Sequence, residues 1–279
     1  MKKILGTLFA LLLTVGLVGC AKQGYRSVDD IKKDGTIKIG VFSDKHPFGY
    51  VDKNGKYQGY DIELANRIGK DLGVKVKLVS TEAANRIEYL KTNKVDIILA
   101  NFTVTDERKE EVDFALPYMN VSLGVVSPSN KVITSLDNWN KNDKLIVISG
   151  TTAETYVTKN YPNIPLQKYD TYANAKNALE NGNGAAWLND NTEVLSFAKS
   201  TKGFTVGIPT LGSQDKIAPA VTKGNSDLKK WIDNEIKSLN KEDFFSKDYD
   251  KTLASVYGKE YKSTIVINCG VKPTGLPVG

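Results

Sequence analysis

Residues 61–79 read DIELANRIGKDLGVKVKLV. The first twelve residues predict a helix, because their apolar side chains recur at helical spacing and Gly73 is a residue type that ends helices. The apolar face comprises Ile62, Leu64, Ala65, Ile68 and Leu72. The run from Val74 to Val79 predicts a β-strand. A helix that leads through a single glycine into a strand is typical of an α/β protein.

The same alternation continues on both sides of this stretch. We expect a strand at 36–42, a hairpin at 50–57 turned by Asn54-Gly55, a helix at 85–91, and strands at 95–99 and 121–128. Short β-rich runs separated by amphipathic segments predict a largely parallel sheet flanked by helices.

A second unit of this kind begins near Leu136. Strands are expected at 144–148, 166–168 and 185–188, and helices at 153–160, 172–179 and 191–199. Residues 207–215 are rich in Gly, Pro and Ser and are expected to form a loop before a strand at 217–221 and a helix from 226 to 239. Two βα units joined by two chain crossings predict two lobes with a cleft between them.

These patterns set the expected domain bounds. Lobe 1 comprises residues 28–125 and 217–267, and lobe 2 comprises residues 126–216. The hinge strands are expected near residues 125–127 and 216–218.

Composition excludes several functions. The chain has 279 residues, of which 41% are hydrophobic and 25% charged, as in ordinary globular proteins. Its net charge is only +6 and its lysines alternate with acidic residues, so we expect no nucleic-acid partner. One His and two Cys leave little for a metal centre or a nucleophilic triad. We therefore expect no metal, no cofactor and no catalysis.

The first twenty residues form a separate segment. Lys2 and Lys3 precede an apolar run and Gly19, which predicts a signal peptide at 1–19; a short N-terminal membrane anchor is the alternative. The sequence Leu17-Val18-Gly19-Cys20 resembles the lipobox of bacterial lipoproteins, which implies that Cys20 is lipidated. Residues 20–27 then form a tether, Cys269 lacks an intramolecular partner, and residues 268–279 are expected to be loosely ordered.

The stretch from Asp96 to Arg108 reads as a buried strand that opens into a polar loop. Ligands of open α/β sheets bind outside such strand ends. Thr103 and the bidentate guanidinium of Arg108 form a candidate carboxylate clamp. The alternative is that Arg108 pairs with Glu111 or Asp113 on a solvated face.

The second lobe supplies two candidates at helix starts. Thr151 and Thr152 offer hydroxyls and backbone N–H groups to an anion, or they simply cap the helix. Asp190 either caps the helix that follows it or projects a carboxylate that holds an ammonium group. An arginine on one lobe and an aspartate on the other would recognise a zwitterion.

Several motifs occur in an order that resembles a known family. Residues 40–60, ANFTVTDER at 100–108, SGTT at 149–152 and NDNT at 189–192 are similar to the polar amino-acid solute-binding proteins of bacterial ABC importers, over about residues 28–257. Residues 48–50, 58–61 and 82–86 are most similar to cysteine-binding lipoprotein members. The resemblance implies a two-lobed periplasmic-binding-protein type II (Venus-flytrap) fold with two hinge crossings, each lobe being a mixed, mostly parallel sheet flanked by helices.

The resemblance also implies residue roles. Arg108 and Thr103, helped by Thr151 and Thr152, would bind the α-carboxylate. Asp190 and the backbone near Asn101 would bind the α-amino group, and Phe48 would pack on the ligand. The implied ligand-binding set is Phe48, Arg86, Asn101, Phe102, Thr103, Arg108, Thr151, Thr152 and Asp190. Many relatives have glycine where Asn101 stands.

Selectivity depends on the side-chain pocket. An unpaired Arg86 would favour an acidic ligand, whereas pairing with Glu82 would suit a small neutral polar ligand such as cysteine. The third reading is that both side chains are exposed and pair with solvent. The resemblance favours cysteine. His46 is expected to be an exposed loop residue, and the alternative is that it lines the pocket. Trp187 is expected to lie in the core, and the alternative is that it forms a further wall of the pocket.

The leading hypothesis is an extracytoplasmic, lipid-anchored, monomeric binding protein that delivers a polar L-amino acid to an ABC-importer permease. Other ligands considered are glutamate, aspartate and glutamine. Two further alternatives are a dehydratase-like enzyme with Glu82 or Asp190 as general acid, and a sensor or adhesin.

Overall fold

The computed structural model describes residues 24–267. The expected signal peptide, the lipidation site Cys20 and the tail at 268–279 lie outside these residues. Within the described part, no helix is both long enough and apolar enough to cross a membrane.

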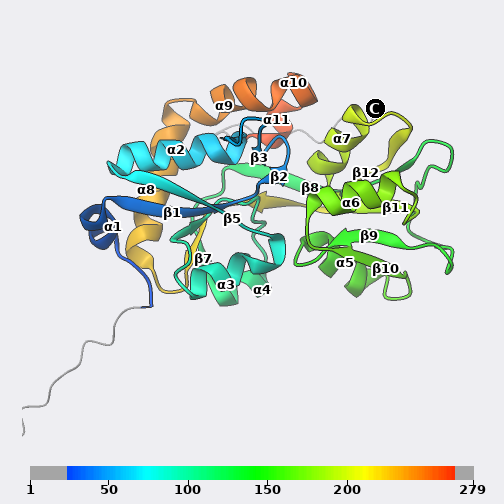
Figure 1. The fold of residues 1–279 in the computed structure, drawn as a ribbon, viewed down its shortest axis with the longest axis horizontal. Coiled ribbons are helices and arrows are strands. Elements are labelled where there is room, and N and C mark those ends of the chain that lie inside the picture. Colours follow the sequence, from blue (N-terminus) through cyan, green and yellow to red (C-terminus); the bar gives the residue numbers. More distant parts are fainter. Residues whose placement is uncertain (1–23, 268–279) are drawn as a thin grey trace, which may run out of the picture.

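Lobe 1 is built on a five-stranded mixed sheet (Figure 1). Its strand order is β5 (Lys75–Ser80), β1 (Thr36–Val41), β6 (Ile97–Ile98), β13 (Ala220–Thr222) and β7 (Val112–Phe114). β1 pairs in parallel with both neighbours, and β13 pairs antiparallel with β6 and β7. The predicted α/β class is confirmed.

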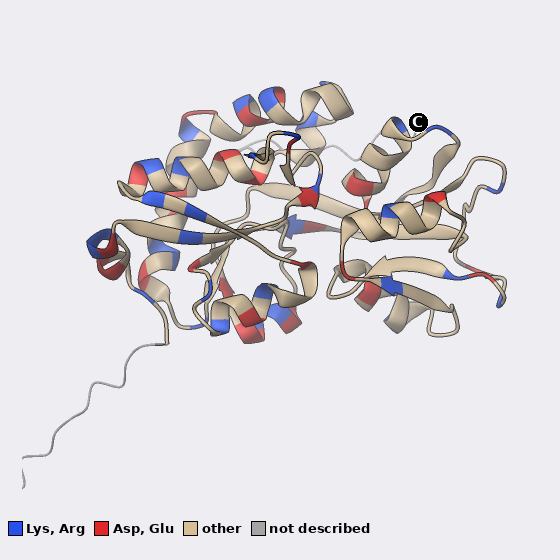
Figure 2. Ribbon diagram, in the orientation of Figure 1, with Lys and Arg blue, Asp and Glu red and all other residues tan. Residues whose placement is uncertain are grey.

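Helices cover both faces of this sheet, with α2 on one side and α3 on the other (Figure 1). They are α1 (Val28–Asp34), α2 (Tyr60–Leu72), α3 (Arg86–Lys91), α4 (Asp106–Glu111), α8 (Ser226–Lys241), α9 (Phe244–Thr252), α10 (Ala254–Tyr257) and α11 (Lys262–Ile265), with a 3₁₀ turn at Ala83–Asn85. Charges of both signs are interspersed along the helices (Figure 2).

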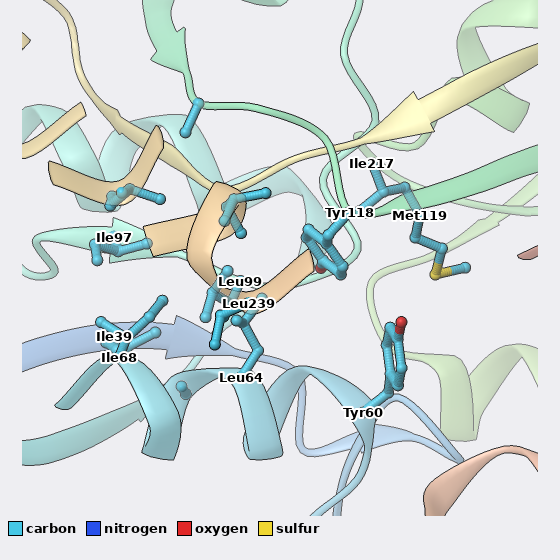
Figure 3. Packing of buried hydrophobic residues seen from close by; sticks show 14 of the residues in the cluster. Ile39, Tyr60, Leu64, Ile68, Ile97, Leu99, Tyr118, Met119, Ile217 and Leu239 are labelled. Atoms are coloured by element: carbon cyan, nitrogen blue, oxygen red, sulfur yellow. The ribbon is translucent and has the colours of Figure 1, made fainter. Parts of the chain in front are cut away.

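The apolar face of α2 forms the core of lobe 1. Leu64 and Ile68 are fully buried and point toward Ile39 and Leu99 of the sheet layer (Figure 3). Gly69 permits the close approach of α2 to β5, because a Cβ there would lie 2.1 Å from a methyl carbon of Val76. The face predicted from residues 61–72 is therefore the one that packs.

Lobe 2 contains a second five-stranded sheet. Its order is β10 (Leu166–Tyr169), β9 (Leu145–Ile148), β11 (Ala186–Asp190), β8 (Met119–Pro128) and β12 (Phe204–Ile217). Its helices are α5 (Thr152–Asn160), α6 (Tyr172–Glu180) and α7 (Asn191–Ser200). β9 is parallel to β10 and β11, while β8 is antiparallel to β11 and β12.

The two lobes are joined through β8 and β12, which run antiparallel with Met119 opposite Ile217. β8 already pairs with β11 at Leu123, so the first crossing precedes the expected hinge at 125–127.

Residues 207–215, expected as a loop, lie within β12. The pairing tolerates their glycine and proline because the register shifts three times, between Val206 and Asp215.

A small antiparallel sheet lies beside the cleft on lobe 1. It consists of β2 (Asp44–Lys45), β3 (Gly49–Val51) and β4 (Tyr57–Gln58). The β3–β4 pair matches the predicted hairpin, and Gly55 adopts the positive φ of 75° that its turn requires. β2 has no counterpart among the predicted elements.

One buried carboxylate makes the stability of lobe 1 depend on pH. Asp248 of α9 is buried and its Oδ2 has no hydrogen-bond partner among the described residues. Burial, and then the charge of Glu63, raise the pKa of Asp248 to about 9. A pKa raised in the folded state means that this group lowers the free energy of unfolding as the pH rises from about 4 to 9.

We therefore expect the stability gained by Asp248→Asn to grow by about 1–3 kcal/mol between pH 5 and pH 8, measured by urea unfolding. Asp250→Asn is the control, because Asp250 lies on the same helix, is exposed and pairs with Lys262. A gain that is the same at both pH values would show that Asp248 is not the titrating group.

Candidate functional site

Several polar contacts cross the cleft and hold the lobes against each other, and four of them involve the predicted site residues or their neighbours. The Lys45 ammonium of β2 contacts the Asp190 carboxylate at the end of β11, with Nζ 2.5 Å from Oδ2. Arg86 and Arg108 of lobe 1 both donate to the carbonyl oxygen of Gly150, at 3.0 and 2.9 Å. The backbone N–H of Ala173 donates to Asp44 at 3.2 Å. The predicted site residues of the two lobes therefore face each other.

Arg108 is positioned by the start of α4. Thr105 caps this helix by accepting from the Arg108 N–H, and Arg108 Nη1 donates to the Thr103 carbonyl at 2.8 Å. The alternative pairing with Glu111 or Asp113 is wrong, since these carboxylates pair with Lys91 and Lys223. Burial, and then the charge of Arg86, lower the pKa of Arg108.

Arg86 is 3% exposed and lies at the start of α3. Its hydrogen-bond acceptors are backbone carbonyl oxygens, those of Ala83, Ala100, Asn101 and Gly150. Glu82 is exposed and accepts instead from Asn85 Nδ2 at 3.1 Å. The pairing of Arg86 with Glu82 and the reading with both side chains in solvent are therefore wrong: the guanidinium is buried, and carbonyl dipoles rather than Glu82 stabilise it.

Asn101 occupies a left-handed backbone position, with φ at 40°. Its backbone N–H and its side-chain amide both donate to Asp61 Oδ2, at 3.1 and 3.3 Å. Tyr118 donates to the other oxygen at 2.6 Å. Burial raises the pKa of Asp61 to about 7. Asp61 thus fixes the turn whose carbonyl oxygens receive Arg86.

Asp190 precedes α7 but makes no side-chain capping bond, so the capping interpretation is wrong. Its carboxylate pairs with Lys45, whose side chain is fully buried. The Lys45 ammonium also lies 4.9 Å from the centroid of the Tyr172 ring.

Lys45 was not predicted as a site residue, because two-residue strands carry no periodic pattern. The available signal was its position just after strand β1, at the sheet edge where ligands bind.

Thr151 and Thr152 lie at the start of α5. Thr151 caps the helix, accepting from the Glu154 N–H at 3.3 Å and donating to the Ile148 carbonyl at 2.7 Å. Thr152 lines a pocket of about 310 Å³ together with Arg108 and Asp215. The capping alternative therefore holds for the Thr151 hydroxyl, while Thr152 faces the same pocket as Arg108.

Three aromatic residues of the predicted set differ in their surroundings. The Phe102 ring lies under both guanidinium groups, 4.4 Å from Arg86 Cζ and 4.8 Å from Arg108 Cζ. Phe48 is fully buried and its ring lies 5.7 Å from the Lys45 ammonium. Trp187 is fully buried against Tyr172 and Phe197, as expected of a core residue.

Two other predicted residues lie at the edges of the site. Thr103 is buried and forms a β-bridge with Ile217, beside the second crossing. His46 is exposed and its ring contacts Tyr50, with centroids 4.6 Å apart. Within residues 24–267, no group of His, Cys, Asp and Glu side chains could hold a metal ion.

Residues 37–254 match the model of the bacterial extracellular solute-binding proteins, family 3. The chain belongs to this family. The predicted family is thereby confirmed, and with it the type II periplasmic-binding-protein fold.

Two solved structures are similar to this family 3 protein over most of its length. The solute receptor for L-cysteine of Neisseria gonorrhoeae is 48% identical with a TM-score of 0.85, covering 87% of this chain and all of that one (100%). The cysteine-binding protein of Campylobacter jejuni is 50% identical with a TM-score of 0.84, covering 86% of this chain and 98% of that one.

A curated relative points to the same process. The ABC transporter glutamine-binding protein of Bacillus subtilis (strain 168) is 28% identical over 269 residues, 91% of this chain and 98% of its own. The family 3 protein is therefore an extracytoplasmic amino-acid-binding protein that works with an ABC-importer permease.

Proposed function

We propose that this protein captures a polar L-amino acid, cysteine in the first place, by closing its two lobes on it and delivers it to the permease. The observation that carries the proposal is that Arg108 of lobe 1 and Asp190 of lobe 2 face one cleft. A cation and a carboxylate on opposite lobes match the two charges of an amino-acid head group. The similarity to the L-cysteine receptor of Neisseria gonorrhoeae and to the cysteine-binding protein of Campylobacter jejuni supports cysteine. Glutamate, aspartate and glutamine are the alternatives.

The proposal assigns each residue a role. Arg108, Thr103 and the start of α5 at Thr151 and Thr152 bind the α-carboxylate. Asp190 and the backbone at Asn101 bind the ammonium group. The aromatic and cationic walls that meet the ligand side chain are Phe48, Phe102 and Arg86.

We further propose that the mature protein is a monomer anchored by lipid at Cys20. Lobe 1 then comprises residues 28–122 and 217–267, and lobe 2 comprises residues 123–216, because β8 pairs with β11 from Leu123 onward. It acts without catalysis. In support, neither candidate general acid suits that role: Glu82 is exposed beside Asn85, and Asp190 is engaged by the Lys45 ammonium.

The decisive experiment is a thermal-shift panel of the twenty amino acids on protein lacking residues 1–20. A ligand at about 100 times its Kd adds about 2.7 kcal/mol to the free energy of unfolding, so the true ligand should stand out. We expect cysteine to give the largest shift. No shift with any amino acid would refute the proposal.

Lobe closure can be tested at Gly150, which has φ at 77°. A Cβ there would lie 2.5 Å from the Ala84 Cα on the opposite lobe. Gly150→Ala should therefore obstruct closure, lower the affinity for the amino acid at least about tenfold and abolish the ligand-induced compaction seen by small-angle X-ray scattering.

Gly182→Ala provides the matched control. Gly182 has φ at 72° and open space around its Cβ position, so its substitution carries the same backbone cost of about 1–2 kcal/mol without the contact. Equal affinity losses in the two variants would show that strain rather than closure is responsible.

A further inference from the structure

Cationic groups outnumber the carboxylate at one end of the cleft. Lys45 and Arg86 share the Phe42 ring, with Nζ 5.6 Å and Cζ 5.7 Å from its centroid. Arg86 also contacts the Phe102 ring, and Arg108 contacts this second ring as well. The cations thus follow one another across two aromatic rings, and Asp190 lies at the Lys45 end.

The other charged and titratable groups near Lys45 reduce this excess without removing it. Glu193 of α7 is buried and pairs with Lys176 of α6, 2.7 Å away. Burial raises the pKa of Tyr172 to about 12, so its hydroxyl is neutral at pH 7. Asp61 of α2 acts on Lys45 as well, but burial raises its pKa to about 7, so its negative charge is incomplete at pH 7. Asp215 of β12 lines the pocket of Arg108. Among the described residues, Asp190 is therefore the ion-pair partner of Lys45, whereas the groups that accept hydrogen bonds from Arg86 are neutral carbonyl oxygens.

An amino-acid ligand adds a further cation to this end. Its carboxylate goes to Arg108, so its ammonium group joins Lys45 and Arg86 around the single carboxylate of Asp190. A carboxylate has about four lone-pair sites, so Asp190 can accept from both ammonium groups. The positive excess would nevertheless be buried on closure, which is costly unless the ligand side chain supplies a negative charge.

We propose that Lys45 and Arg86 determine specificity by selecting an anionic side chain, so that cysteine is bound as its thiolate. This inference rests on the proposed function and defines the chemical form of its ligand. The cysteine S–H bond breaks, its electron pair stays on sulfur, and the proton passes to the buffer; no bond to the protein forms. Neighbouring Lys and Arg side chains stabilise thiolates in the same way in proteins.

Proton release on binding tests the proposal. Isothermal titration calorimetry is run at pH 7.0 with a phosphine reductant, in buffers of small and large ionisation enthalpy. Because a thiol with a pKa of about 8.5 is protonated at this pH, we expect close to one proton released per cysteine bound. Cysteine affinity should rise close to tenfold per pH unit between pH 6 and 8. Serine, which has the same shape without the thiol, should release none.

Variants locate the effect. Lys45→Arg keeps the charge and should retain proton release, whereas Lys45→Met should flatten the pH profile for cysteine. If Lys45→Met does not fold, proton release by the unaltered protein decides. Cysteine binding without proton release overturns the thiolate and leaves the proposed function standing. Binding of aspartate or glutamate but not cysteine overturns the thiolate together with the cysteine assignment. Binding of no amino acid refutes the proposed function itself.

Discussion

Asp190→Ala is expected to abolish amino-acid binding and to lower the free energy of unfolding by about 3–5 kcal/mol. Both effects have one cause. The carboxylate is the proposed partner of the ligand ammonium, and it is also the partner of the fully buried Lys45. Removing it leaves the Lys45 charge uncompensated in the protein interior. Calorimetry with cysteine and urea unfolding measure the two losses separately.

The double variant Lys45→Met with Asp190→Ala separates the two roles of Asp190. Replacing both members of a buried ion pair with apolar residues is often close to neutral for stability. We therefore expect this variant to recover most of the lost stability but not the binding. Near-native affinity in Asp190→Ala would refute the head-group assignment, and unchanged stability would show that Lys45 finds another partner.

Arg108→Ala is expected to weaken amino-acid binding by at least about 100-fold, or about 2.7 kcal/mol, because the bidentate contact with the α-carboxylate is lost. The fold should persist, since the hydrogen bonds of the Arg108 guanidinium within the described part of the chain go to the carbonyl oxygens of Thr103 and Gly150, and no ion pair is lost. Calorimetry and far-ultraviolet circular dichroism check the two statements.

Two further substitutions serve as controls for Arg108→Ala. Arg108→Lys keeps the charge without the planar fork and should give an intermediate loss. Arg67→Ala removes an arginine that pairs with Asp71 and Glu242, and should leave affinity unchanged. An Arg108→Ala variant that binds as tightly as the unaltered protein would place the carboxylate elsewhere.

The sequence predicted those features that depend on local periodicity. The helix at 60–72 and most strands of the two five-stranded sheets lie within a few residues of expectation, because their apolar residues form a recognisable pattern; the three-residue strand β7 was not predicted. Strand β12 was not predicted, because its glycines and proline are typical of a loop. Its pairing with β8 continues past them through shifts in register.

The site was predicted in its residues but not in its contacts. Arg86, Arg108 and Asp190 lie at the cleft, yet their partners come from distant parts of the chain: Lys45 is separated from Asp190 by 145 positions. No periodic pattern encodes such a pairing. The carbonyl oxygens that receive Arg86 are equally invisible, because every residue carries one.

The strand order of lobe 1 has a consequence for the order in which the chain can fold. β13 lies between β6 and β7, although the whole of lobe 2 precedes it in the chain. On the ribosome, or during export, lobe 2 is complete while lobe 1 still lacks β13 and the helices α8 to α11, which supply part of its core. Until β13 and these helices are made, the early part of lobe 1 has apolar surface exposed to water. Pulse-labelled hydrogen exchange during refolding should therefore show protection in β9 and β11 no later than in β1, and the reverse order would contradict this.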